Sequence, residues 1–359
     1  MVRSSVFGFL ILLLSATAVN AQTSTCAQTL RLARSTYEQG RFHEIPALLE
    51  NCLKGGEGNF TKQESVEALR ILTLAYLYQE EPEQADQAML RLLNTDHFFE
   101  INANVDPAEF VALYRTFRTT PLFSIGLRAG VNSTLAAPKK NYYVGGTAAN
   151  SGEYSQGINF QVGAVFEKQL FTGKRKDSPW TAAPEIMFTN HSYGYANESL
   201  TISDQTGQPY SFIDGFFDQS RLDLNALAQY KLKNSIINPY LTFGVAASLL
   251  VKGEFQVETQ FPEEGSVVTG TPVDMKKTFN PLDYALIAGA GVKYKFGDIY
   301  LVADVRYKYG LTNLVKTSAR SNPEATFDYG FVSNDLTQSS LMVNIGFVWP
   351  YFNPKKLLK

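Results

Sequence analysis

The sequence contains few of the residues that enzymes and metalloproteins use for chemistry. Its 359 residues include two cysteines, two tryptophans and three histidines, and only 18% of them are charged. Two cysteines without further cysteines or histidines nearby cannot complete the four-ligand shell of a zinc site, so we expect no metal and no other cofactor. The formal charge of −2 argues against the strongly basic surface of a nucleic-acid-binding protein.

Long hydrophobic runs are also absent. A membrane-spanning helix needs about 20 apolar residues, and the most apolar segment, residues 6–14, is far shorter. Arg3 precedes this segment, and the small residues Val19 and Ala21 follow it, which is typical of a secretory signal peptide. We therefore predict a signal peptide over residues 1–21, cleaved after Ala21.

The two cysteines, Cys26 and Cys52, follow soon after this segment. An even pair in an oxidising compartment predicts one disulfide, with two buried free thiols as the alternative. Closing a loop of about 25 residues would contribute about 3 kcal/mol of stability.

Apolar residues follow the helical period from residue 22 to residue 118. One predicted helix has Ile45, Leu48, Leu49 and Cys52 on one face. The next helix begins after a capping box at Thr61 and Glu64, and a further helix starts with Pro82 in its first turn. The net charge of residues 22–118 is 9 basic minus 14 acidic residues, or −5, which does not favour binding of an anionic polymer.

The second helical hairpin resembles a tetratricopeptide repeat (TPR). The matching apolar positions are Leu69, Leu72, Tyr76, Ala85, Met89 and Leu92. The resemblance implies a concave surface for a protein partner. Helices that simply pack their own core would show the same pattern, because two hairpins fall short of the three repeats usually needed. Both alternatives predict a small helical domain over residues 22–118.

The period changes to two after Pro121, where apolar and polar residues alternate over about ten positions, the pattern of a tilted membrane-crossing strand. Nineteen tyrosines and 25 phenylalanines suit such strands. We predict eight strands, the first over residues 123–131 and the others over residues 158–170, 180–190, 221–232, 240–251, 282–296, 299–309 and 341–351.

The predicted connections alternate between short and long. Short turns lie at residues 172–174, 233–235 and 297–298, and long loops lie at residues 132–157, 192–219, 253–281 and 310–338. This is typical of bacterial outer-membrane barrels, whose long loops are extracellular. The fold class is therefore a small all-α domain followed by an eight-stranded antiparallel transmembrane β-barrel over residues 119–359. Its N-terminal domain and C-terminus would lie in the periplasm of a Gram-negative bacterium.

The last predicted strand carries a more specific motif. Asn344, Gly346, Trp349 and Tyr351 resemble the signal read by the outer-membrane barrel-insertion machinery, although residues 352–359 follow it. The region from Asp106 onward, through residues 114–121 into a glycine-alternating strand, resembles Bacteroidota outer-membrane barrels, among them the PorT-like family. Some of that wider group assist protein secretion, but no residue here carries that role over.

If the apolar residues face lipid, the alternate residues line the barrel interior. We expect these to form an ion-pair network, because an eight-stranded barrel is only wide enough to be filled by side chains and confined charges must pair. The predicted members are Arg128, Glu167, Glu185, Asp223, Lys231, Asp283, Lys293, Asp304 and Arg306, with Lys295 and Lys308 on the same face. A narrow solute channel is the alternative.

Two other functions remain open. A barrel-embedded lipid or peptide hydrolase would need His191 as its base, although a lone histidine near a loop is more often a surface residue. Aromatic residues in the long loops, at 142–143, 212, 216–217 and 261, would contact a partner or lie among lipid headgroups. We favour a non-enzymatic barrel, held in outer-membrane lipid, that acts as an anchor or scaffold and presents the helical domain to a periplasmic or outer-membrane protein.

Overall fold

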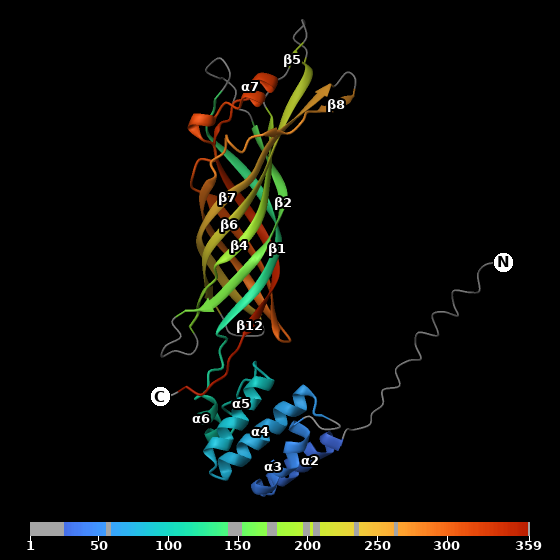
Figure 1. Cartoon of the computed structure of the whole chain (residues 1–359), viewed down its shortest axis with the longest axis vertical. Helices are drawn as coiled ribbons and strands as arrows, with labels where there is room; N and C mark the ends of the chain where they lie inside the picture. Colours follow the sequence, from blue (N-terminus) through green and yellow to red (C-terminus); the bar gives the residue numbers. More distant parts are fainter. Residues whose placement is uncertain are drawn as a thin grey trace, which may run out of the picture. The chain divides into compact units, whose positions relative to one another are not determined.

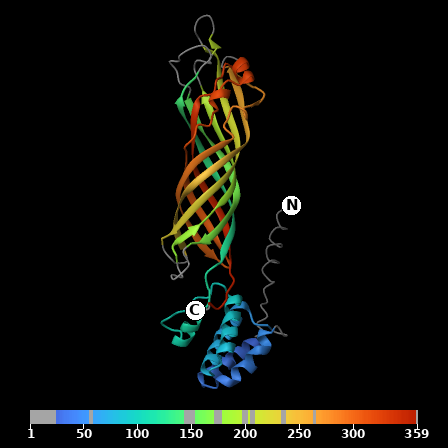
Figure 2. The same ribbon diagram turned by 60° about the vertical axis from the view of Figure 1, so that its left-hand side comes forward.

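The computed structural model describes residues 25–54, 59–142, 153–170, 178–196, 202–203, 209–232, 237–261 and 265–357. The predicted signal peptide and the short turns at 172–174 and 233–235 lie outside these residues. The chain forms two compact units. One contains Met1–Thr119 together with Asn353–Lys359, and the other contains Thr120–Phe352. Figures 1 and 2 show a helical unit and a barrel-like sheet of long tilted strands.

The helical unit begins its helices where the sequence analysis placed the capping signals. The Thr61 hydroxyl accepts from the Glu64 backbone N–H, and the Thr61 N–H donates to Glu64 Oε2 at 2.9 Å, so the predicted capping box forms. Pro82 occupies the first turn of its helix. The helices are α2 (Thr25–Glu38), η1 (Phe42–Glu44), α3 (Ile45–Leu53), α4 (Lys62–Tyr78), α5 (Pro82–Thr95) and α6 (Ala108–Tyr114). None of the described helices is both long and apolar enough to cross a membrane.

The core of this unit joins all of its longer helices. Leu49 of α3, Leu72 of α4 and Met89 of α5 are fully buried in one cluster. The predicted disulfide is confirmed: Cys26 of α2 is bonded to Cys52 of α3. The bond ties α2 to α3, which stabilises a core too small to depend on apolar burial alone.

Residues 353–357 belong to the helical unit, whereas the sequence analysis grouped them with the barrel. The Arg118 N–H donates to the Lys355 carbonyl at 3.0 Å, and the Leu357 N–H donates to the Thr116 carbonyl at 2.8 Å. Lys356 forms an ion pair with Asp86 of α5. Sequence periodicity did not indicate this grouping, because the tail is held by backbone pairing, which any sequence can supply.

All eight predicted strand segments are strands in the structure. They correspond to β1 (Phe123–Lys140), β2 (Glu153–Gln169), β3 and β4 (Trp180–Ala182 and Glu185–Ala196), β6 (Pro209–Lys231), β7 (Ile237–Phe261), β10 (Leu282–Phe296), β11 (Ile299–Gly310) and β12 (Asp335–Tyr351). Pro184 lies in the break between β3 and β4, where a proline cannot donate to the sheet.

The pairings of these strands are antiparallel and continuous. β1 pairs with β2, β2 with β4, β4 with β6, β6 with β7, β7 with β10, β10 with β11, β11 with β12, and β12 with β1. The succession therefore returns to the strand at which it began. A turn of a few residues can join only antiparallel strands, so the predicted short connections already indicated antiparallel neighbours.

The long loops were predicted to lack strands, and this was wrong for much of their length. β1, β6 and β7 continue into the predicted loop regions, because backbone pairing continues after the apolar outward pattern has ended. The same end of the sheet also contains β5 (Ile202–Ser203), β8 (Ser266–Thr269), β9 (Val273–Asp274), η3 (Thr317–Ala319) and α7 (Pro323–Tyr329), and Figure 1 shows α7, β5 and β8 there together.

Side chains alternate between the two faces of this sheet as the sequence pattern predicted. On β1, Ile125 and Leu127 are about half exposed on the outer face, while Arg128 is 2% exposed on the inner face. On β12, Ile345 is 66% exposed and Asn344 is buried. The outer face is thus apolar and the inner face polar, the reverse of a water-soluble sheet.

Candidate functional site: the barrel interior

Arg128 is buried on the inner face of the sheet, and its neighbours across both strand pairs are glycines. It lies opposite Gly163 of β2 and Gly346 of β12. A Cβ atom on Gly346 would lie 3.1 Å from Arg128 Cγ, so the absence of a side chain there leaves room for the arginine, whereas a Cβ atom on Gly163 would meet Met187 of β4. The sequence therefore combines a long charged residue with small residues in the register that the pairing requires.

Three carboxylates surround this guanidinium. Arg128 Nη2 lies 3.5 Å from Glu167 Oε1, and Nε lies 3.3 Å from Glu185 Oε1. Nη1 is paired with Asp304 Oδ2. The three carboxylates come from β2, β4 and β11, so a single arginine connects strands from different parts of the wall.

Two further cations complete the charge balance. Arg306 Nη1 lies 2.6 Å from Glu185 Oε2, and Arg306 Nε lies 2.9 Å from Asp304 Oδ1. Lys293 Nζ lies 2.6 Å from Glu167 Oε2 and 2.8 Å from Gln229 Oε1. Three cations thus balance three carboxylates, which offsets the cost of removing each charge from water.

A second group of charges lies along the same interior face. Lys308 Nζ lies 2.6 Å from Asp223 Oδ2 and 2.9 Å from Ser248 Oγ. Arg221 is fully buried and donates to Gln219 Oε1 at 3.0 Å, and Asp283 accepts a hydrogen bond from Thr312. This group also contains two cations and two carboxylates.

Aromatic rings fill the end of the interior beneath the long loops. The ring centroids of Tyr193 and Phe217 are 4.8 Å apart, those of Phe217 and Phe255 are 4.6 Å apart, and those of Phe255 and Phe331 are 4.6 Å apart. Phe279 belongs to the same buried cluster. The loops that include β9, η3 and α7 thus supply an apolar core that covers this end of the interior.

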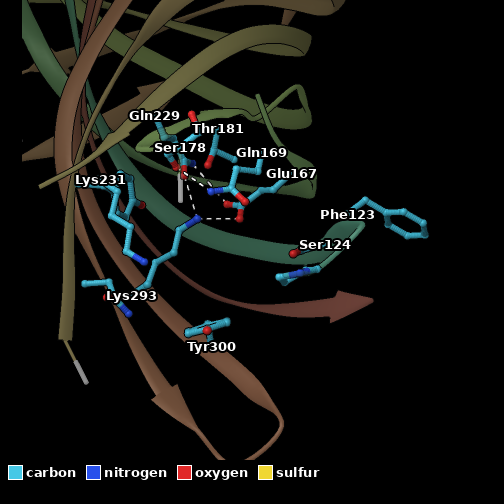
Figure 3. Close-up of a pocket in the computed structure, with 13 residues that line it drawn as sticks. Phe123, Ser124, Glu167, Gln169, Ser178, Thr181, Gln229, Lys231, Lys293 and Tyr300 are labelled. Carbon is cyan, nitrogen blue, oxygen red and sulfur yellow. Dashed lines mark hydrogen bonds and ion pairs between the residues drawn. The ribbon is translucent and has the colours of Figure 1, made fainter. Parts of the chain in front are cut away.

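The opposite end contains a cavity of about 170 Å³ (Figure 3). Glu167, Gln229 and Lys293 line it, and the dashed contacts in Figure 3 join them to one another. Lys231 and Tyr300 line the same cavity. At roughly 30 Å³ per water molecule, the cavity has room for about five waters.

The predicted interior residues have different positions in the structure. Arg128, Glu167, Glu185, Lys293, Asp304 and Arg306 form one connected network, and Asp223 pairs with Lys308 in the second group. Asp283 accepts a hydrogen bond from the Thr312 hydroxyl, and Lys231 lines the cavity. Two interior residues were not predicted: Arg221, although it shares the strand parity of Asp223, and Tyr240, whose hydroxyl donates to Asp304 at 2.8 Å.

His191 is not a surface residue. Its side chain is buried, and Nδ1 lies 2.9 Å from the Thr134 hydroxyl. The neighbouring Ser192 is on the other face of β4, where its hydroxyl accepts from Asn159 Nδ2 at 3.0 Å. The His191 ring and the hydroxyl of its neighbour in the sequence therefore lie on opposite faces of the sheet, and the histidine is closed off from solvent.

The motif in β12 divides between the two faces. Asn344 faces the interior, where its Nδ2 donates to Asp304 Oδ1 at 2.9 Å. Trp349 and Tyr351 are more than half exposed on the outer face. Tyr351 stacks with Phe123 at a centroid distance of 4.9 Å, so aromatic rings gather outside the short-turn end of the strands, as in a membrane-interface belt.

Comparisons with known proteins give the family and a set of distant structural likenesses. Residues 116–316 match the family described as "Outer membrane protein beta-barrel domain". No curated protein matches the chain.

Among solved structures, a major outer membrane protein of Thermus thermophilus is 12% identical, with a TM-score of 0.31, over 64% of this chain and 99% of that one. Outer membrane protein W of Escherichia coli is 15% identical, with a TM-score of 0.30, over 65% and 98%. The Escherichia coli outer membrane protease OmpT is 8% identical, with a TM-score of 0.25, over 64% and 96%. Likenesses at these TM-scores carry no argument about the activity of this chain.

Proposed function

We propose that this chain, which belongs to the outer membrane protein beta-barrel domain family, is a non-conducting and non-enzymatic anchor for its helical unit. Family membership implies the outer membrane of a Gram-negative bacterium. We further propose that the ring of strand pairings is a closed eight-stranded barrel with its short turns, helical unit and C-terminus in the periplasm. The finer resemblances to PorT-like barrels and to TPR domains stay predictions.

The observation that carries this proposal is the filled interior. Arg128, Arg306 and Lys293 each contact at least one carboxylate, and aromatic side chains fill the long-loop end. A conducting pore needs a continuous water-filled path, and opening one here would require breaking buried ion pairs, each at a cost of several kcal/mol. The helical unit, with its own core and disulfide, is then the part available to a periplasmic protein.

Catalysis is the weaker candidate. His191 is 1% exposed, and the hydroxyl that it contacts, that of Thr134, is completely buried, so a substrate in solution cannot reach this pair. Within the described residues, no group of three or more histidine, cysteine, aspartate or glutamate side chains is arranged to hold a metal ion. We therefore propose no hydrolytic or metal-dependent role.

The test combines conductance and partner capture. Purified full-length protein in planar lipid bilayers should show no stable ion current, and a current that persists in wild type would contradict the anchor proposal. Crosslinking in intact envelopes should then capture a partner with wild type but not with a variant that lacks residues 22–118. The proposal fails if the captured proteins are the same, and unchanged barrel insertion of the deletion variant is the control.

A further inference from the structure

The two longest strands, β6 and β7, pair with each other along almost their whole length, and their outer face changes character at one point. β6 and β7 pair from Lys231 and Tyr240 to Phe212 and Gln260, and the register shifts at Ser220 and Arg221. Below the shift, Val245 and Leu249 of β7 are about half exposed on the outer face, and Val251 is the extra residue at the shift. A bulge lets one strand gain a residue, so that a different set of side chains points outward above it.

Above the shift, the outer face is charged instead of apolar. Lys252 is exposed, and its Nζ lies 2.7 Å from Glu254 Oε2. The bulge therefore marks the level at which the lipid-facing surface of these two strands ends. Figure 1 shows the upper ends of β6 and β7 with β8 at this end of the sheet.

The strand pairing places like charges directly opposite one another on this face. Asp214 of β6 pairs with Glu258 of β7, and Asp218 pairs with Glu254. Side chains directly opposite in an antiparallel pair lie about 5 Å apart at Cβ, and like charges in that position are destabilising. Lys252 partly balances the Asp218 and Glu254 pair, whereas no cation among the described residues pairs with Asp214 or Glu258.

An aromatic residue lies between the two acidic pairs. Phe216 is opposite Gln256, and its side chain is 45% exposed, whereas Phe217 and Phe255 of the same two strands are buried. We call the outward residues Asp214, Phe216, Asp218, Glu254, Gln256 and Glu258 the blade face. Its apolar centre and acidic rim are the arrangement of a protein-binding surface, and its charge would repel the phosphates of lipid headgroups.

We propose that the blade face binds a basic protein segment. Lysine or arginine side chains of the partner contact Asp214 and Glu258, and an apolar or aromatic side chain packs on Phe216. The unbalanced carboxylates, which weaken the free sheet, supply the charge complementarity when the partner is bound. The extracellular position of the blade face rests on the orientation proposed above. Binding by the purified protein does not depend on that orientation.

The test uses the purified full-length chain in detergent and a fluorescein-labelled peptide with a tryptophan between two runs of lysine. Fluorescence anisotropy should show binding that weakens with added salt, and a peptide with glutamates in place of the lysines should not bind. Asp214→Asn combined with Glu258→Gln should weaken binding by about threefold to tenfold. Phe216→Ser should weaken it by about threefold.

Matched controls come from α7 at the same end of the molecule. Phe327→Ser replaces an aromatic residue that is 88% exposed, and Glu324→Gln with Asp328→Asn removes two exposed carboxylates. Both control variants should bind the peptide as wild type does. The Asp214 and Glu258 double variant should unfold no more easily than wild type, because it loses a repulsion, so weaker binding is not explained by misfolding.

Three results would overturn the proposal. The first is equal peptide binding by wild type and the double variant, and the second is an equal loss of binding in the α7 controls. The third is calorimetry in which calcium alone binds wild type and not the double variant, while the lysine peptide binds both alike, because the face would then be a cation site. Labelled peptide added to intact cells tests the orientation separately.

Discussion

Gly346 of β12 lies directly opposite Arg128 of β1, and a Cβ atom built on Gly346 would lie 2.3 Å from the Leu127 carbonyl oxygen and 3.1 Å from Arg128 Cγ. Gly346, which the sequence analysis assigned to an insertion motif, therefore makes room for Arg128 in the interior network.

Gly346→Ala should destabilise the barrel by about 1–3 kcal/mol, because the added carbon cannot fit without moving the β1 backbone or the arginine side chain. Gel mobility of heated and unheated samples in increasing urea would measure the loss. Ala129→Val adds volume to the outer face of the same strand and should have little effect. If Gly346→Ala were as stable as wild type, the β1 backbone and the Arg128 side chain would be able to move aside without cost.

Arg128→Met should cost about 3–5 kcal/mol, because it leaves Glu167, Glu185 and Asp304 without their shared cation. Adding Glu185→Gln should recover part of that loss, since one buried charge is removed. Urea unfolding of the two variants and of Glu185→Gln alone gives the coupling between the residues. Additive effects within about 0.5 kcal/mol would contradict a direct interaction.

Replacement of Cys26 and Cys52 by serine should destabilise the helical unit by about 2–4 kcal/mol. Hydrogen exchange of residues 25–119 in the full-length chain would measure this, and the barrel strands serve as the internal reference. The single variants should match the double variant. Unchanged protection in the double variant would show that the apolar core alone holds α2 in place.

The helical unit should lose stability as the pH falls below about 4.5. Lys54, which donates to Glu50 at a distance of 3.0 Å, and then Arg91 hold the pKa of Glu50 below its ordinary value of 4.5. A carboxylate whose pKa is lowered in the folded state contributes stability above its unfolded pKa, and this contribution is lost as the pH falls through the folded pKa.

The expected effect is under about 1 kcal/mol, because the Glu50 side chain is partly exposed and water screens the charges. The measurement is the protection of residues 25–119 at pH 7 and at pH 3. Glu50→Gln should reduce the difference between the two values. If the Glu50→Gln variant showed the same pH dependence as wild type, Glu50 would not be the cause of the loss.

Removal of residues 353–359 should loosen the helical unit and leave the barrel intact. The tail donates and accepts backbone hydrogen bonds with residues 116–118, and Lys356 is paired with Asp86. Exchange at residues 116–118 should rise by about tenfold, equivalent to about 1.4 kcal/mol, if two backbone hydrogen bonds are lost. Lys356→Ala is the smaller control, and loss of barrel insertion on truncation would contradict the assignment of the tail.

Much of the fold follows from local patterns. The capping box at Thr61, the turn at Pro82 and the alternation along β1 each depend on neighbours within a few residues, so the sequence predicts them directly. The break at Pro184 and the continuation of β6 and β7 into the loops were missed. Strand ends there are decided by which backbone lies alongside, and a single sequence does not contain that information.

By itself, the sequence determined the eight strand segments, the helical unit, the cysteine pair and which side chains face the interior, because periods of 3.6 and 2 are local consequences of backbone geometry. Only the tertiary structure decided which interior charges meet. Arg128 and Asp304 are 176 positions apart, and their contact depends on the register of β1, β12 and β11. The tertiary structure also decided that His191 is buried, that the C-terminal tail belongs to the helical unit and that Asp214 lies opposite Glu258. Each of these features depends on contacts between segments that are far apart in the sequence and are brought together only when the chain folds.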